Sequence, residues 1–149
     1  RGIHHVSVDA KGRMALPVRL RDELLQYDEA NVVVTIDPTS RCLLMYPLPE
    51  WDQIQEKLDR SPTFQSQARR LQRLLVGHAT DLEIDKAGRV LLPAPLRDFA
   101  ALDKKAALLG QRKKIEIWSQ EGWDAQREEY LEDNSLNDMQ LNDLMDISL

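Results

Sequence analysis

The sequence has few of the residues and segments that mark several common classes of protein. Cys42 is the only cysteine among 149 residues, so an intramolecular disulfide is impossible and a reducing compartment such as the cytoplasm is the simplest setting. Because it lies in the apolar run Cys-Leu-Leu-Met-Tyr, we expect a buried thiol on a strand and not a reactive one. No apolar run approaches the roughly 20 residues of a membrane span, and the first residues lack the apolar segment of a secretory signal. We therefore expect no contact with a membrane.

An overall positive charge, which many nucleic-acid-binding proteins have, is also absent. The formal net charge is −5, but residues 128–149 alone hold seven acidic side chains and no basic one. Residues 1–127 hold 20 basic against 18 acidic side chains, a balance that is compatible with a local basic face. With 42% hydrophobic and 30% charged residues, the composition is that of a globular protein. Bulk charge therefore neither supports nor excludes DNA binding.

What the chain does contain is an internal repeat. The segment Asp9–Asp22 aligns without a gap with Asp85–Asp98, and eight of the fourteen positions are identical, whereas about one identity is expected by chance. A second match joins Tyr46–Asp52 to Trp118–Asp124, at an offset of 72 residues instead of 76. The chain is therefore a tandem duplication whose second copy is four residues shorter between these landmarks.

Each copy shows the same succession of elements. Alternating apolar residues, Val6 and Val8 or Leu82 and Ile84, predict a strand that enters a tight turn and returns in a short strand. The short strands should end at Leu16 and Leu92; helices opened by Pro17 and Pro93 should run to about Gln26 and Leu102. Two strands follow in each copy, over 32–36 and 42–46 and over 107–109 and 114–118, and helices headed by Trp51 and Trp123 close the copies. Trp51, Trp118 and Trp123 are either core or an exposed protein-binding cluster, and their positions favour core.

A helix is predicted between the two copies. Phe64, Ala68, Leu71 and Leu75 share one helical face, and Gly77 is a candidate stop. Arg69, Arg70 and Arg73 lie off that face and either contact phosphates or form a solvated surface, which is the simpler interpretation. The expected organisation is a first module over 1–60, a linker helix over 61–77, a second module over 78–131 and an acidic tail over 132–149. The tail is a mobile terminus, a dock for a neighbouring subunit or a competitor of DNA, and the first is the simplest.

The turns of the repeat, Asp9-Ala-Lys-Gly-Arg13 and Asp85-Lys-Ala-Gly-Arg89, carry its chemistry. The aspartates can accept hydrogen bonds from turn amides, and Gly12 and Gly88 permit the positive φ that such turns need. We therefore assign Asp9, Gly12, Asp85 and Gly88 an architectural role.

The arginine after each glycine begins the returning strand, so the turn fixes the direction of its guanidinium. Arg13 and Arg89 could reach guanine O6 and N7 together or clamp a phosphate. Lys11 and Lys86, in the same turns, would add attraction to the DNA backbone. The alternative is that each arginine only bridges to the aspartate of its own turn.

Taken together, these motifs resemble the MraZ family of bacterial transcriptional regulators, whose relatives include AbrB-like and SpoVT-like swapped-hairpin DNA-binding modules. The resemblance covers nearly the whole chain. It rests on both Asp-x-x-x-Arg turns with the following Leu-Pro, Tyr46-Pro-Leu-Pro-Glu-Trp51, Arg69-Arg-Leu-Gln-Arg-Leu-Leu, Gly77-His-Ala and the closing Asp-Ile-Ser-Leu. Paired turns with this linker are a specific signature, whereas a single turn is a weak one.

The resemblance implies an α+β fold of two tandem swapped-hairpin modules with short helices, related by a pseudo-twofold axis. It implies a cytoplasmic, nucleoid-associated protein that forms ring-shaped homo-oligomers. The implied partner is double-stranded DNA with direct repeats upstream of the division and cell-wall gene cluster. The family's motif falls on Asp9 and Arg13 and on Asp85 and Arg89.

The helix after the turn has one basic residue fewer in the second copy than in the first. Pro95 stands in the second copy where Arg19 stands in the first, so we expect the first copy to be the stronger DNA reader, with Arg19 and Arg21 as helpers. Arg21 and its counterpart Arg97 could instead form salt bridges with nearby carboxylates.

Other functional classes have weaker support. Asp9 and Asp85 could share a proton as a catalytic pair, but no nucleotide-binding glycine loop, Asp-Thr-Gly element or Ser-His arrangement accompanies them. His4 and His5 would point to opposite faces of a strand, and His78 has no ligand partner at a useful spacing. We expect no enzyme, metal, cofactor or small-molecule substrate. The main alternative is an antitoxin-like interaction module with secondary DNA binding.

Overall fold

The computed structural model describes residues 1–26, 30–62 and 64–134, so the predicted acidic tail lies outside the described residues from position 135 onward. The helices and strands follow one another along the chain in this order: β1 (Gly2–Ser7), β2 (Arg13–Ala15), α1 (Val18–Leu25), β3 (Asn31–Ile36), β4 (Leu43–Pro47), α2 (Leu48–Asp59), α3 (Ser66–His78), β5 (Thr80–Glu83), β6 (Arg89–Leu91), α4 (Ala94–Phe99), β7 (Lys105–Gly110), β8 (Ile115–Ser119) and α5 (Gln120–Glu132). In the described ranges, no helix is both long and apolar enough to cross a bilayer.

The main sheet has six antiparallel strands in the order β1-β7-β8-β4-β3-β5. Equivalent strands of the two copies occupy matching places counted from opposite ends of this order: β1 and β5 at the two edges, then β7 and β3, then β8 and β4 at the centre. At the centre Leu44 pairs with Glu116, two positions that the repeat makes equivalent. The predicted α+β fold of tandem modules with a pseudo-twofold relation is therefore confirmed.

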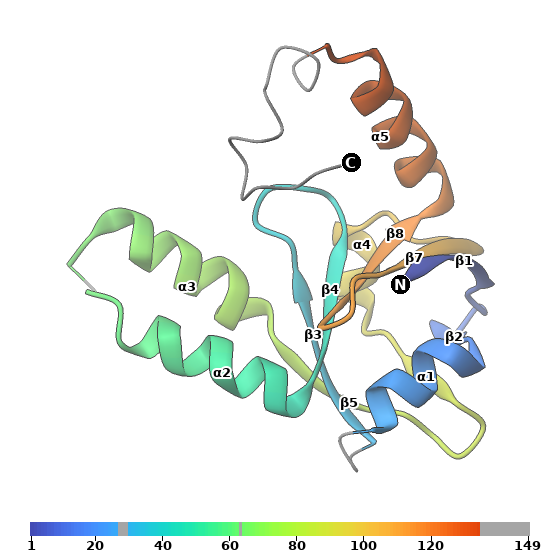
Figure 1. The fold of residues 1–149 in the computed structure, drawn as a ribbon, viewed down its shortest axis with the longest axis horizontal. Coiled ribbons are helices and arrows are strands. Elements are labelled where there is room, and N and C mark those ends of the chain that lie inside the picture. Colours follow the sequence, from blue (N-terminus) through green and yellow to red (C-terminus); the bar gives the residue numbers. More distant parts are fainter. Residues whose placement is uncertain (27–29, 63, 135–149) are drawn as a thin grey trace, which may run out of the picture.

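The two copies exchange strands. β1 of the first copy pairs with β7 of the second, from Gly2 opposite Gly110 to Ser7 opposite Lys105. In return β5 of the second copy pairs with β3 of the first, from Asn31 opposite Glu83 onward. Because each ladder needs a strand from the other copy, the modules interlock instead of folding side by side (Figure 1).

A second, two-stranded sheet also takes one strand from each copy. In this β2–β6 ribbon Met14 pairs with Val90, and both side chains are buried in the core. The pairing continues past the strands, since the Leu16 amide donates to the Gly88 carbonyl and the Leu92 amide to that of Gly12, both at 2.9 Å. Each turn is therefore joined to the strand that leaves the other turn.

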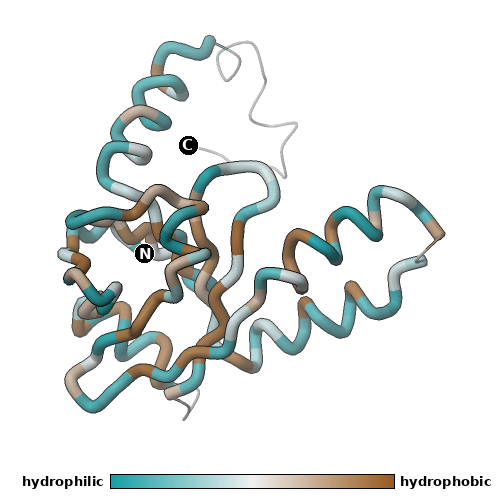
Figure 2. Tube along the Cα trace, turned by 180° about the vertical axis from the view of Figure 1, so that it is seen from behind, coloured by the Kyte–Doolittle hydropathy of each residue, from teal (hydrophilic) through white to brown (hydrophobic). Residues whose placement is uncertain are grey.

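The main core is drawn from both copies, including Leu20 and Leu24 of α1 and Leu96 of α4. Two smaller clusters hold aromatic pairs with tilted rings, Tyr46 with Trp51 and Trp118 with Trp123, at centroid distances of 5.8 and 5.7 Å. The tryptophans lie in core clusters as predicted, although Trp123 is only partly buried. Figure 2 shows hydrophobic residues concentrated in the strands of the body, while the projecting α2–α3 hairpin mixes both kinds.

Several predicted boundaries shift by a few residues. Pro17 and Pro93 precede α1 and α4 as N-cap residues instead of opening them. α4 ends at Phe99 and not at Leu102, because the chain turns through Ala101, whose φ is 51°. Cys42 is fully buried as expected, one residue before β4 begins.

The predicted linker helix exists as α3, but its predicted stop is wrong and its predicted apolar face is right only at the C-terminal end, at Leu75. The helix continues through Gly77 to His78, Phe64 precedes it and is 82% exposed, and Leu71 is also exposed. Leu75 and Val76 instead pack on the cluster around Val33, and the buried Thr35 hydroxyl donates to the Leu75 carbonyl at 2.6 Å. Only the C-terminal half of α3 reaches the sheet, since its first half runs beside α2 in the projecting hairpin (Figure 1).

Candidate nucleic-acid interface

The two turns of the repeat are built by the same hydrogen bonds. In the first, Asp9 Oδ1 accepts from the amides of Lys11 and Arg13 at 3.0 and 2.9 Å. In the second, Asp85 Oδ1 accepts from the amides of Ala87 and Arg89 at 2.9 and 2.8 Å. One carboxylate oxygen in each turn thus holds the backbone on both sides of the glycine.

The other oxygen of each carboxylate holds a guanidinium. Asp9 Oδ2 accepts from Arg13 Nε at 2.7 Å, and Asp85 Oδ2 accepts from Arg89 Nε at 3.0 Å. The terminal Nη groups of both arginines have no protein partner in the described part of the chain, and their side chains are 38% and 42% exposed. The predicted bridge across the turn therefore exists, but it uses Nε and leaves the two outer nitrogens available.

The same bonds keep the carboxylates ionised. The hydrogen bond from the Arg13 backbone amide, followed by that from its side chain, lowers the pKa of Asp9. The backbone amide of Arg89 is likewise the main cause that lowers the pKa of Asp85. Because these groups are exposed, the ion pairs orient the arginines more than they stabilise the fold.

The β2–β6 ribbon determines where the arginines point. Arg13 lies directly opposite Leu91, and Ala15 directly opposite Arg89. Opposed residues of an antiparallel pair share a face, and residues two apart on a strand do so as well. The alternate positions, Met14 and Val90, are buried, so these four side chains form the outer face of the ribbon.

Arg21 and Arg97 pack across the copies. A Cβ at Gly12 would lie 2.7 Å from Cζ of Arg97 and 2.8 Å from the Leu92 carbonyl oxygen, and a Cβ at Gly88 would meet the guanidinium of Arg21. Within the described residues neither arginine forms an ion pair. Arg21, which we had grouped with Arg13, therefore lies beside the turn of the second copy.

The remaining predicted contacts are exposed. Lys11 and Lys86 lie at the surface of the two turns, and Arg19 is exposed on α1. Arg19 lines a surface depression with Glu23, Gln26 and Arg112, apart from the residues of the ribbon. Arg69, Arg70 and Arg73 are also exposed, without an ion pair among the described residues, which is compatible with both interpretations of this surface.

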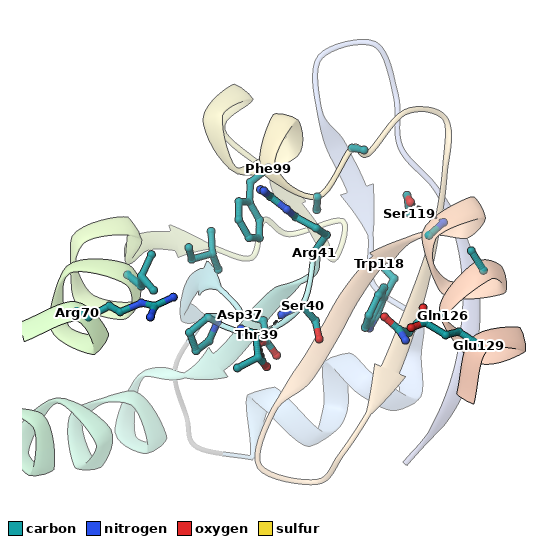
Figure 3. Close-up of a pocket in the computed structure, with 17 residues that line it drawn as sticks. Asp37, Thr39, Ser40, Arg41, Arg70, Phe99, Trp118, Ser119, Gln126 and Glu129 are labelled. Atoms are coloured by element: carbon teal, nitrogen blue, oxygen red, sulfur yellow. Dashed lines mark hydrogen bonds between the residues drawn. The ribbon is translucent and has the colours of Figure 1, made fainter. Parts of the chain in front are cut away.

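A hollow of about 580 Å³ lies between the β3–β4 loop, α3 and α5. Arg41 extends over the ring of Phe99, 4.7 Å from its centroid, on one side of this hollow (Figure 3). An equivalent hollow lies between α2 and the β7–β8 loop, with Tyr46 and Lys57 in the places of Trp118 and Glu129. Because the hollow recurs with different side chains, we attribute it to the packing of a hairpin tip of one copy beside the last helix of the other.

One cluster was not foreseen from the sequence. Asp37, Cys42 and Glu116 place their potential ligand atoms within 4.8 Å of one another. Burial, followed by the charges of Glu116 and Asp37, raises the pKa of the Cys42 thiol. Asp37 accepts amides of its own loop, and Glu116 Oε1 accepts from Trp118 Nε1 at 3.0 Å. We interpret the cluster as a brace for the β3–β4 loop, which spacing could not reveal because its members come from a loop and from β8.

Comparisons with known proteins agree with the repeat. The family described as "MraZ protein, putative antitoxin-like" matches residues 1–74 and again residues 75–144. A protein of Marinomonas sp. (strain MWYL1) named "Transcriptional regulator MraZ" is 74% identical over 149 residues, which cover 100% of this chain and 99% of that protein. Proteins of the same name from Alkalilimnicola ehrlichii and Coxiella burnetii (strain Dugway 5J108-111) are 52% and 46% identical and cover 89% and 88% of this chain, and 89% and 86% of their own lengths.

The hydrogen bonds that Asp9 accepts should be visible as a lowered pKa when its carboxyl group is titrated. Its pKa lies below that of a free aspartate, so the stability that it contributes is present above the unfolded pKa and is lost as the pH falls through the folded one. In a carboxyl NMR titration, Arg13→Ala should raise the Asp9 pKa only part of the way, because the backbone amide at position 13, the main cause, remains. Arg60→Ala, at the C-cap of α2, should leave it unchanged. A wild-type Asp9 pKa at the ordinary value for aspartate would refute these hydrogen bonds.

Gly12 should not tolerate a side chain. Its φ is +90°, and a Cβ would collide with Arg97 and the Leu92 carbonyl, so Gly12→Ala should lower the free energy of unfolding in urea by at least about 1–2 kcal/mol. Gly77→Ala is the matched control. Nothing lies within 4 Å of a Cβ at this position in α3, so the change should stabilise by up to about 1 kcal/mol. Equal effects of the two substitutions would contradict the packing of Arg97 on the turn.

Proposed function

Because the chain belongs to the MraZ family, we propose that it regulates transcription by binding double-stranded DNA through the outer face of the β2–β6 ribbon. The relatives named above are transcriptional regulators, and regulation of transcription is what the family membership supports for this chain. One observation carries the mechanism. A ribbon apart from the main sheet exposes two guanidiniums, each held only through Nε.

This geometry suits the recognition of bases. The major groove of B-DNA admits a two-stranded β-ribbon, and an arginine reads guanine by donating to O6 and N7 together. With Nε of Arg13 and Arg89 bound to an aspartate, the two Nη groups are the donors that remain for DNA. The aspartate sets the orientation of the guanidinium in advance, which lowers the entropy lost on binding.

The other basic residues would position the protein on the duplex. Lys11 and Lys86 flank the ribbon at its two turns and are exposed, as backbone-contacting side chains must be. Arg21 and Arg97 support the opposite turns and reach phosphate only at the edge of the interface. Arg19, on the exposed side of α1, is an accessory phosphate contact.

We further propose that the chain acts as a ring-shaped homo-oligomer on the short direct repeats that the family resemblance implies, upstream of the division and cell-wall gene cluster. The ribbon offers few cationic contacts, and the whole chain carries a net charge of −5, so one subunit would bind weakly. A ring makes each later contact intramolecular, and its avidity rises without new chemistry.

A second candidate function is protein interaction with DNA binding secondary. The family description contains the words antitoxin-like, and Phe64 is exposed at the tip of the α2–α3 hairpin. In that case the substitutions in the ribbon described next would leave the main activity unchanged.

The arginines test the proposal directly. Binding to the DNA upstream of its own gene should weaken by about 1–3 kcal/mol in Arg13→Ala, with relaxed preference for guanine at one position. Arg89→Ala should have a smaller effect, because we expect the first copy to be the stronger reader. Arg60→Ala, which removes an exposed arginine at the C-cap of α2 from an ion pair with Glu56, is the control. A double Arg13→Ala, Arg89→Ala variant that binds like the wild type would refute the role of the ribbon.

Avidity makes a separate prediction. Affinity should rise steeply from a duplex with one repeat to a duplex with several, and the salt dependence should steepen because more phosphates are contacted. Sedimentation of the protein alone and with each duplex reports the assembly. A folded monomer that binds both duplexes equally well would remove the ring from the proposal.

A further inference from the structure

The outer face of the ribbon holds a large apolar side chain beside the arginines. Leu91 is 54% exposed and lies directly opposite Arg13. Its counterpart in the first copy is Ala15, which lies directly opposite Arg89. The two arginines of the proposed interface therefore have different neighbours.

The fold does not require a leucine at this position. Val90 and Leu92, on either side of it, are buried in the core, whereas Leu91 faces solvent. Ala15 occupies the equivalent place in the same ribbon and shows that a methyl group suffices for the strand pairing. Leu91 contributes little to the core of the free protein and stays available for contact with a partner.

The chemistry of the partner follows from distance and charge. Directly opposed Cβ atoms in an antiparallel pair are about 4.5–5.5 Å apart, and successive bases of one strand rise about 3.4 Å. An arginine at position 13 that reads a guanine therefore places Leu91 over a neighbouring base pair. The apolar group that base edges present in the major groove is the C5 methyl of thymine. The flanking guanidiniums of Arg13 and Arg89 favour a polyanion over an apolar patch of another subunit.

We propose that Leu91 contacts the C5 methyl of a thymine adjacent to the guanine read by Arg13. This inference rests on the proposed function of the ribbon. It makes the two ends of the ribbon unequal: the end with Arg13 and Leu91 reads guanine and thymine together, while the end with Arg89 and Ala15 reads mainly guanine.

The test uses deoxyuridine, which differs from thymidine only by lacking this methyl. Each thymine of the bound repeat is replaced in turn, and affinity is measured for the wild type and for Leu91→Ala. One replacement should weaken wild-type binding about three- to five-fold, the equivalent of about 0.8 kcal/mol for one buried methyl group. The same replacement should have no effect on Leu91→Ala.

Two further variants sharpen the result. Ala15→Leu should create sensitivity to a second thymine, next to the guanine read by Arg89. Leu131→Ala removes an even more exposed leucine, 72% against 54% for Leu91, from α5, and it should keep the wild-type response to deoxyuridine. Sedimentation of Leu91→Ala should match the wild type.

Failure of the proposed function and failure of the thymine contact give different results. If the wild type shows no preference for its upstream DNA over random DNA, the proposed function fails and this inference falls with it. If binding depends on Arg13 but no deoxyuridine weakens it, or the penalty persists in Leu91→Ala, only the inference fails. A change in the sedimentation of Leu91→Ala would assign the leucine to a contact between subunits and overturn the thymine contact.

Discussion

The structure depends on the exchange of strands between the two copies of the repeat. β1 and β5 complete the half of the main sheet that belongs to the other copy, and β2 and β6 pair with each other. Neither copy can satisfy the backbone hydrogen bonds of its strands or bury Met14 and Val90 by itself. The pseudo-twofold axis follows from this exchange, and it places two equivalent turns at the ribbon.

The exchange also explains how the turns become rigid enough to aim a side chain. Each is closed locally by its aspartate, joined to the other copy by the amides of Leu16 and Leu92, and backed by Arg21 or Arg97 from the opposite helix. A guanidinium held this way has lost much of its rotational freedom before it meets a ligand, so less entropy remains to be lost on binding. Duplication supplies the geometry twice, while the pair Ala15 and Leu91 shows that the copies have diverged on the surface that they share.

The prediction of secondary structure from the sequence succeeded where signals are local. Alternating apolar residues located the strands, and the paired Asp-x-x-Gly-Arg segments located the turns. It succeeded only in part for α3: of the predicted apolar face, Leu75 packs on the cluster around Val33, whereas Phe64 and Leu71 are exposed. Helical periodicity gives a face, but it does not tell which half of a helix meets the sheet. The packing of Arg21 on the turn of the other copy was missed because the two segments are far apart in the sequence.

The amino-acid sequence by itself determined the duplication, the element order and the turn that orients each arginine, because the hydrogen bonds of a turn join residues within five positions of one another. Only the tertiary structure decided which strands pair, which arginine backs which turn, and that Leu91 shares a face with Arg13. Such relations join residues far apart in this chain: Arg21 and Gly88 are 67 positions apart, and His4 and Leu108 are 104 positions apart. No local pattern encodes them, because they arise from the free energy of closing a shared core.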